Sequence, residues 1–319
     1  MSEPNPAAPD LPQLTKGQVF LRRLLSSVIL WSVVLGAMFS GHKVVSDTVF
    51  LVIMSVLAAL GMIEFYGLVE KRGLVCFKRE GILAGLLLMF ATFICFSGAV
   101  DWVKSPDAPA KANDFEVSFL ILFVLGLCIR QFVSRANTAG ILAISTTLFG
   151  LMYVPWLLNF IQKIYYFPRY ELVGNGTFFV LYFILVTKMS DTGAYFVGSL
   201  IGRHQMIPRI SPGKTWEGFG GALLFSVGGS VLFAHFAGAN LGTKLYPAGM
   251  PLGHAITLGF ILAVAAVIGD LIESLFKREA GVKDSGGMFP GIGGILDLLD
   301  SLLFNAPLMY LYLRHILTN

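Results

Sequence analysis

The chain has 319 residues, of which 55% are hydrophobic and only 13% are charged. Soluble domains carry about 25% charged residues, so the composition excludes a soluble globular protein, and its high apolar content excludes a disordered chain. Apolar, charge-poor chains are typical of polytopic membrane proteins, because about 20 apolar helical residues span the hydrocarbon layer. The sequence therefore predicts an all-α, multi-pass integral membrane protein.

The N-terminal segment is polar and rich in proline, which predicts a flexible cytoplasmic tail over residues 1–23. Apolar stretches then recur along the chain, and each predicts one membrane helix. The nine expected spans are about 24–41, 48–68, 81–103, 115–133, 139–162, 175–200, 217–238, 254–276 and 296–316.

The distribution of basic residues predicts the orientation of these spans. With the N-terminus in the cytoplasm, 15 Lys and Arg residues fall on the cytoplasmic side and seven on the other, with Lys188 inside a span. Positive charge favours the cytoplasmic side. The segments 203–216 and 277–295, which hold nearly every unusual motif, are then cytoplasmic.

Several functional classes are excluded by residue type and spacing. Three cysteines lie far apart without a CxxC pair, and five histidines show no HxxH or HExxH spacing, so a zinc enzyme lacks its ligands. A net charge of +4 is too small and too scattered to indicate nucleic-acid binding.

Acidic residues occur inside apolar stretches of the last third of the chain. Asp270 and Glu273 lie in VIGDLIESLF and share one helix face with Ser274 and Lys277. A charged residue at the membrane centre costs about 2.5–3.5 kcal/mol. Similar placements recur in other spans, at Lys188 and Asp191 and at Asp297 and Asp300. Converging carboxylates suit a hard cation such as Mg²⁺, although structural ion pairs with Lys188, Lys277, Arg278 and Lys283 are the alternative.

Two glycine-containing segments follow these helices. The GKT triplet at 213–215 lacks the earlier glycine of a nucleotide-binding P-loop, since Pro208 stands there. Ser211, Gly213, Lys214 and Thr215 still place hydroxyls, amides and a lysine before a helix start, which favours phosphate. Residues 274–301 place basic residues before a glycine-rich turn and two aspartates, which phosphoryl or nucleotidyl transfer requires.

Residues 186–301 resemble the phosphatidate cytidylyltransferase (CDP-diacylglycerol synthase) family. SDTGAY at 190–195 and SPGKTWEG at 211–218 are similar to blocks of that family. Its signature falls on Ser274, Lys277, Arg278, Lys283, Asp284, Pro290, Gly291, Gly293, Gly294, Asp297 and Asp300. Ile292 and Leu298 replace the usual His and Arg, so the resemblance fits either a divergent active enzyme or an altered paralogue.

The resemblance implies transfer of CMP from CTP to phosphatidate in phospholipid biosynthesis, with release of diphosphate. A CTP-dependent lipid kinase and a non-catalytic membrane transporter are the alternatives. The expected partners are CTP, phosphatidic acid and the lipid bilayer, without nucleic acid, and a homodimer is compatible with the sequence. The expected location is the inner (plasma) membrane, with the active site facing the cytoplasm.

The predicted site lies in the C-terminal region. We expect N-terminal transmembrane helices over 24–170 and a C-terminal catalytic transmembrane region over 171–319. The expected catalytic residues are Asp270, Lys277, Arg278, Lys283, Asp284, Asp297 and Asp300, the substrate-binding residues are Ser211, Gly213, Lys214, Thr215, Ser274, Gly293, Gly294 and Asp191, and the Mg²⁺ ligands are Asp270, Asp297 and Asp300.

Overall fold

The computed structural model describes residue 36 and residues 42–97, 108–134, 139–167, 171–283, 285–286 and 294–318. The predicted tail over 1–23 lies outside the described residues, and so does the first predicted span over 24–41 apart from Gly36. The remaining eight predicted spans all coincide with helices, and the prediction of a helical multi-pass protein is confirmed.

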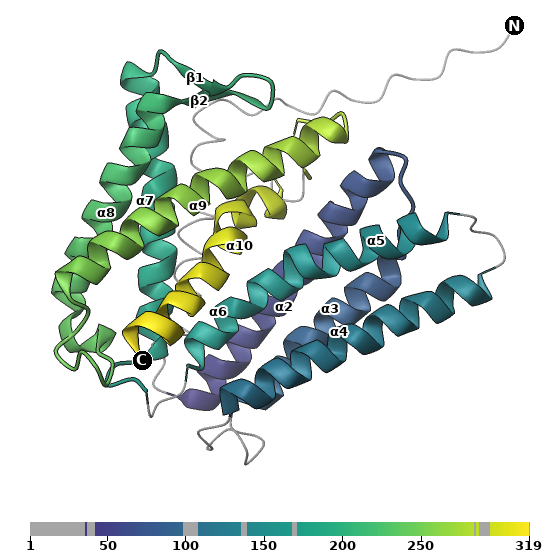
Figure 1. The fold of residues 1–319 in the computed structure, drawn as a ribbon, viewed down its shortest axis with the longest axis horizontal. Coiled ribbons are helices and arrows are strands. Elements are labelled where there is room, and N and C mark those ends of the chain that lie inside the picture. Colours follow the sequence, from purple (N-terminus) through teal and green to yellow (C-terminus); the bar gives the residue numbers. More distant parts are fainter. Residues whose placement is uncertain are drawn as a thin grey trace, which may run out of the picture.

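The first half of the described chain forms a set of long helices, which lie side by side in Figure 1. They are α2 (Lys43–Lys71), α3 (Lys78–Phe96), α4 (Ala108–Val133), α5 (Gly140–Leu151) and α6 (Leu157–Tyr165), with the π-helical turn η2 (Met152–Trp156) between α5 and α6. Pro155 lies in η2 and has no N–H to donate, which explains the local change of helix geometry.

The second half adds three helices and a short hairpin before the last helix. The elements are α7 (Gly176–Ile201), β1 (Gln205–Ile207), β2 (Ser211–Thr215), α8 (Trp216–Ala237), the 3-10 turn η3 (Gly238–Leu241), α9 (Leu252–Glu279), α10 (Ile295–Tyr312) and the π-helical turn η4 (Leu313–Leu317). The antiparallel strands β1 and β2 pair Gln205 with Thr215 and Ile207 with Ser211. The sequence predicts only a helix start after this segment, and the hairpin is an addition that it does not predict.

Seven helices in the described part of the chain are long and apolar enough to cross a membrane. They are Lys43–Lys71, Lys78–Phe96, Asn113–Val133, Gly140–Tyr165, Trp216–Leu241, Leu252–Glu279 and Ile295–Leu317. Helix α7 is 26 residues long and packs among them, although it carries Lys188 and Asp191. The predicted count of nine spans is not confirmed.

Close helix packing in the second half depends on glycine. A Cβ atom on Gly193 of α7 would lie 2.5 Å from the Gly221 carbonyl oxygen of α8, and the reverse substitution would meet the Gly193 carbonyl at the same distance. Small residues let membrane helices approach closely, where van der Waals packing and hydrogen bonds replace a hydrophobic driving force. On the other face of α8, the Ser226 Oγ donates to the Gly259 carbonyl of α9 at 2.8 Å.

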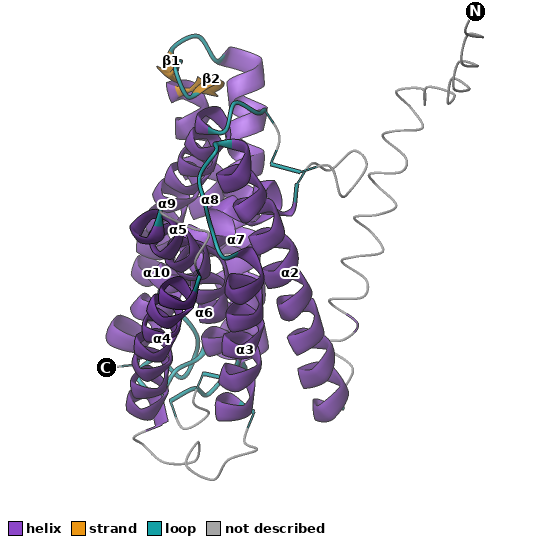
Figure 2. Cartoon of the chain, turned by 90° about the vertical axis from the view of Figure 1, so that its right-hand side faces the viewer, coloured by secondary structure: helices purple, strands orange, loops and turns teal. Residues whose placement is uncertain are grey.

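Helix α10 joins the two halves, because it packs against α9 and α7 as well as α2 and α6. The hairpin projects at one end of the bundle in Figure 2. The carboxyl ends of α2 and α9 and the start of α10 lie toward this hairpin end in Figure 1. The loop before α9 and the C-terminus lie at the opposite end.

Candidate active site

Three carboxylates from two helices converge inside the bundle. Asp270 and Glu273 lie one turn apart on α9, Asp300 lies on α10, and one oxygen of each is within 4.8 Å of the others. Glu273 is fully buried and Asp300 is 7% exposed. The helices can approach because residue 269 is a glycine, since a Cβ there would lie 2.7 Å from the Asp300 carbonyl oxygen. We call Asp270, Glu273 and Asp300 the carboxylate triad.

Two lysines contact the carboxylate triad. Lys214 Nζ, from the hairpin, lies 2.7 Å from the Asp270 Oδ2. Lys277, one turn after Glu273 on α9, forms ion pairs with Glu273 and with the Asp297 Oδ1, the latter at 2.5 Å. Asp270 and Glu273 therefore have ammonium partners. The structural ion-pair alternative expects the pairing of Glu273 with Lys277, whereas it does not include Lys214, the partner of Asp270.

The charges of the region do not balance, however. Lys188 pairs with Asp191 at 3.0 Å. Among the described residues, no Lys or Arg lies within ion-pair distance of Asp300, although Lys188 acts on it electrostatically from farther away, and Asp300 accepts a hydrogen bond from the Ser301 N–H at 2.5 Å. Five carboxylates thus face three lysines. Carboxylate oxygens in excess of the cations, with Glu273 and Asp300 buried and Asp270 partly exposed, form a donor set that fits a hard divalent metal such as Mg²⁺.

Asp297 lies beside the carboxylate triad and has a second role at the start of α10. Its Oδ2 accepts the Gly294 N–H at 2.9 Å and the Ser285 hydroxyl at 3.2 Å. This hydrogen bond to the residue before the helix is the carboxylate half of a capping box. The sequence groups Asp297 with Asp270 and Asp300, whereas Glu273 is the residue that the structure places with them.

The hairpin positions the residues of the GKT segment. Besides its ion pair, Lys214 donates to the Val267 carbonyl of α9 at 3.3 Å, so the hairpin is held against that helix. The Thr215 Oγ1 accepts the Gly218 N–H at 3.1 Å and caps α8, as the predicted helix start requires. Ser211 is half-buried in β2 and Gly213 is exposed.

The remaining predicted site residues are spread around this centre. Arg278 Nε donates to the Ile210 carbonyl of the hairpin at 3.2 Å, Ser274 is buried on α9, and Lys283 is exposed after that helix. Asp191 accepts the Ser301 hydroxyl at 3.1 Å, which joins α7 to α10. Asp284 and Gly293 lie outside the described residues.

Besides Glu273, the polar residues near the site that do not appear among the predicted site residues include Ser301 and Glu64. Ser301 accepts from Lys188 at 3.1 Å and stands next to Asp300. Glu64 on α2 accepts the Leu296 N–H at 2.9 Å, although 232 residues separate them. The only sequence signal for Glu64 is a carboxylate within the apolar run GMIEFYG, which periodicity alone does not connect to the C-terminal region.

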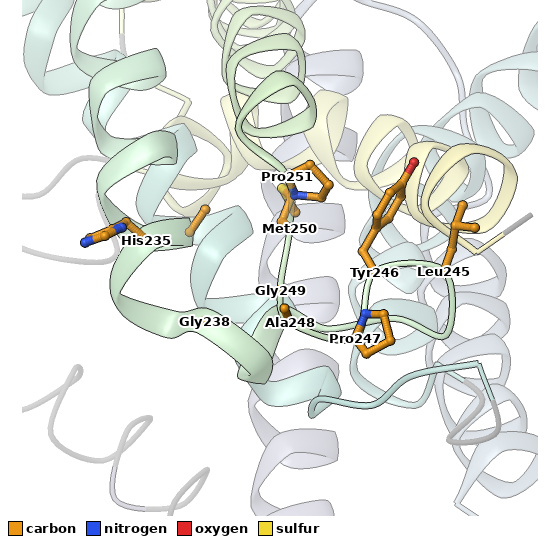
Figure 3. Close-up of a pocket in the computed structure, with 10 residues that line it drawn as sticks. His235, Gly238, Leu245, Tyr246, Pro247, Ala248, Gly249, Met250 and Pro251 are labelled. Atoms are coloured by element: carbon orange, nitrogen blue, oxygen red, sulfur yellow. The ribbon is translucent and has the colours of Figure 1, made fainter.

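A hollow of about 540 Å³ lies at the opposite end of the bundle, beside the loop before α9. Figure 3 shows it between His235 on α8 and the loop residues Tyr246 to Pro251. It contains no carboxylate and none of the predicted site residues. The hollow is therefore separate from the candidate active site.

Fold and site together define a multi-pass membrane protein whose buried carboxylates and lysines suit the chemistry of a metal-bound phosphate. Comparison with known families agrees with this class. The model of the cytidylyltransferase family matches residues 21–316, so the chain belongs to this family and is a membrane nucleotidyltransferase.

Bacterial relatives match most of the chain. The phosphatidate cytidylyltransferase of Staphylococcus haemolyticus is 32% identical over 254 residues, which is 80% of this chain and 86% of the relative. That of Staphylococcus saprophyticus is 30% identical over 277 residues, or 81% and 97% of the two chains. That of Mycobacterium bovis is 30% identical over 238 residues, or 72% of each chain.

Proposed function

We propose that the protein transfers CMP from CTP to phosphatidate, forming CDP-diacylglycerol and diphosphate. The observation that carries this proposal is the carboxylate triad with Lys214 and Lys277 against it, in a chain similar to phosphatidate cytidylyltransferases. In the reaction, a phosphate oxygen of phosphatidate forms a bond to the α-phosphorus of CTP, and the bond from that phosphorus to the bridging oxygen breaks. The electron pair leaves with diphosphate.

The carboxylate triad would hold Mg²⁺, with Asp297 close enough to share in the site. When bound, Mg²⁺ would neutralise triphosphate charge and make the α-phosphorus more electrophilic. The chain does not need to supply a general base, because the attacking phosphate oxygen is already an anion. Its own task is to bind and orient two anionic substrates, which accounts for the lysines around the acids.

Basic residues around the triad would bind the phosphates. The ammonium groups of Lys214 and Lys277 each contact a carboxylate of the triad, and each could also bind a phosphate oxygen of a substrate. Arg278 lies in the last turn of α9 and Lys283 lies just after that helix, where both could bind phosphate. Strand β2 of the neighbouring hairpin contains Ser211, Gly213 and Thr215, whose hydroxyls and backbone amides would also bind phosphate. Ser274, Gly294 and Asp191, together with Asp284 and Gly293, stay in the proposed site as substrate-binding or orienting residues.

The position of the site suits a lipid substrate. The carboxylate triad lies in the parts of α9 and α10 toward the hairpin end, which the positive-inside rule assigns to the cytoplasm. Phosphatidate would arrive laterally with its phosphate at the interface, and CTP would arrive from the cytoplasm. We place the protein in the inner (plasma) membrane and keep a homodimer as a prediction for size measurement in detergent.

Labelled CTP tests the reaction directly. Purified protein is incubated with phosphatidate and Mg²⁺ together with CTP labelled at either the α- or the γ-phosphorus. We expect α-label in the lipid product and γ-label only in diphosphate. Lipid that carries the γ-label would identify a CTP-dependent kinase, and an unlabelled lipid fraction would identify a transporter or an inactive paralogue. Either result would overturn the proposal.

A further inference from the structure

Glu64 is a buried carboxylate of the first half of the chain that meets the glycine-rich segment of the second half. It lies on α2 and is 7% exposed. Its Oε2 accepts the Ser285 hydroxyl at 3.1 Å and the Leu296 N–H at 2.9 Å. One oxygen therefore contacts residues on both sides of the segment 287–293.

The glycines on either side of that segment fit the same carboxylate. A Cβ atom on Gly286 would lie 2.2 Å from the Glu64 Oε1, and a Cβ on Gly294 would lie 2.5 Å from the Glu64 Oε2. At Gly294 the Ser285 Oγ would be nearer still, at 2.0 Å. Real Cβ atoms do not approach other atoms this closely, so any larger residue at either position would displace Glu64, Ser285 or the backbone. The position of the Glu64 carboxylate therefore requires glycine at both 286 and 294.

The environment of Glu64 differs from that of a structural ion pair. Among the described residues, no Lys or Arg side chain lies within ion-pair distance of it. Its hydrogen-bond partners are the hydroxyl and the backbone N–H just described. A buried acid without a cation is expensive in a membrane helix, and packing alone would favour an apolar residue there.

Hydrogen bonds connect Glu64 to the candidate active site. The Ser285 hydroxyl lies within hydrogen-bond distance of both the Glu64 Oε2 and the Asp297 Oδ2, at 3.1 and 3.2 Å, and donates its single proton to one of them at a time. Asp297 in turn pairs with Lys277, which also pairs with Glu273 of the carboxylate triad. A displacement of Glu64 would therefore move the start of α10 and the partner of Lys277.

We propose that Glu64 is a positioning residue for nucleotidyl transfer, which joins the two sides of the glycine-rich segment and thereby fixes Asp297 and Lys277. This inference rests on the proposed function, because Asp297 and Lys277 take part in a reaction only if the protein catalyses the proposed CMP transfer. Glu64 contacts neither residue of that pair directly and acts through Ser285 and the start of α10.

The first test compares two replacements of Glu64. Glu64→Gln keeps one oxygen in place to accept both hydrogen bonds, so we expect kcat within about 3-fold of the wild type. Glu64→Leu removes both acceptors, and we expect kcat to fall about 10-fold or more with the KM for CTP and phosphatidate unchanged, because small misplacements of reacting groups cost up to about 10²-fold. Equal kcat values for the two variants would overturn the proposal.

Glu116→Leu is the matched control for a merely structural role. Glu116 on α4 is also buried, and it contacts Lys163 at 2.6 Å and Asn159 at 3.0 Å, neither of which belongs to the candidate active site. We expect its replacement to lower the thermal unfolding midpoint in detergent while kcat per folded molecule stays unchanged. A fall in kcat like that of Glu64→Leu would show that any buried acid has this effect, and would contradict a specific positioning role.

A double-mutant cycle tests the contact without using activity. Gly286→Ala is measured alone and together with Glu64→Ala, with the thermal unfolding midpoint as the readout. We expect a clear fall in the wild-type background and a much smaller one when the carboxylate is absent. Equal falls in both backgrounds would overturn the contact. Because this result does not depend on turnover, failure of the inference is distinguishable from failure of the proposed reaction.

Discussion

At the scale of single residues, Asp297 has a structural role at the start of α10 and a chemical role in the proposed site. Its Oδ2 accepts the Gly294 N–H, which stabilises the start of α10, while its Oδ1 faces Lys277 beside the carboxylate triad. The hydrogen bond needs only an oxygen acceptor, whereas the pairing with Lys277 needs negative charge. The two roles can therefore be separated by substitution.

Asp297→Asn keeps an oxygen acceptor and removes the charge. We expect the variant to insert and to keep its thermal unfolding midpoint within a few degrees, while turnover falls about 10²-fold, the usual scale for losing one electrostatic contact in an active site. Asp297→Ala should also lose the cap, at a further cost of about 1 kcal/mol in stability. Retained turnover in Asp297→Asn would exclude a charged role.

Cys76, between α2 and α3, gives a prediction that depends on pH. Burial, with the nearby Glu70 carboxylate adding to it, raises the pKa of the Cys76 thiol to about 11. Only the thiolate reacts with maleimide, so in a Cys95→Ser, Cys128→Ser background we expect slow labelling at pH 7.5 that rises about tenfold per pH unit toward pH 11. A rate that levels off near pH 9 would contradict this environment.

At the scale of elements, the contact between α9 and α10 brings the triad together. Gly269 stands where α9 meets the backbone of Asp300 on α10, and a Cβ there would also lie 3.0 Å from the Phe304 ring. Neither neighbour is the free end of a flexible side chain. The spacing of these two helices, and with it the geometry of the carboxylates, therefore depends on the absence of a side chain at position 269.

Gly269→Ala should separate α9 from α10. We expect a loss of about 1–3 kcal/mol in stability, typical of overpacking, together with reduced turnover. Gly253→Ala is the control on the same helix, because a Cβ at Gly253 has no atom within 4 Å. Thermal unfolding midpoints and turnover of both variants check this, and equal effects of the two substitutions would contradict the role of Gly269.

Features that depend on local sequence patterns can be predicted from the sequence, whereas contacts between distant segments cannot. The shared face of Asp270 and Glu273 follows from helix geometry, and eight predicted spans coincide with helices because apolar length is a strong signal. The hairpin at 205–215 was missed, since three- and five-residue strands leave little pattern. The contact of Glu64 with Leu296 spans 232 residues, and it depends on how α2 packs rather than on any local pattern.

At the scale of the whole molecule, the two ends of the bundle differ in chemistry. The hairpin end carries the site with its lysines and carboxylates, whereas the opposite end carries the hollow of Figure 3. Helix α10 contacts helices of both halves, so changes in α2 can reach the triad. The proposed orientation places the hairpin end in the cytoplasm.

Cysteine labelling tests this orientation. Gly213→Cys in the hairpin and Leu245→Cys in the loop before α9 both replace exposed residues, in a chain without its three native cysteines. In intact cells, with the periplasm accessible, we expect a membrane-impermeant maleimide to label Leu245→Cys alone, and both positions to react after lysis. Labelling of Gly213→Cys in intact cells would contradict the proposed orientation, because it would place the hairpin on the periplasmic side.

The most direct test of the account is the Mg²⁺ dependence of CMP transfer in wild type and in Asp300→Asn. α-Labelled CTP, phosphatidate and purified protein are combined over a range of Mg²⁺ concentrations, and labelled lipid is measured. We expect wild-type transfer to require Mg²⁺, and Asp300→Asn to lose about 10²-fold or more in rate and to need more Mg²⁺ for half-activation. Transfer by Asp300→Asn at the wild-type rate and with the wild-type Mg²⁺ dependence would contradict the assignment of the carboxylate triad.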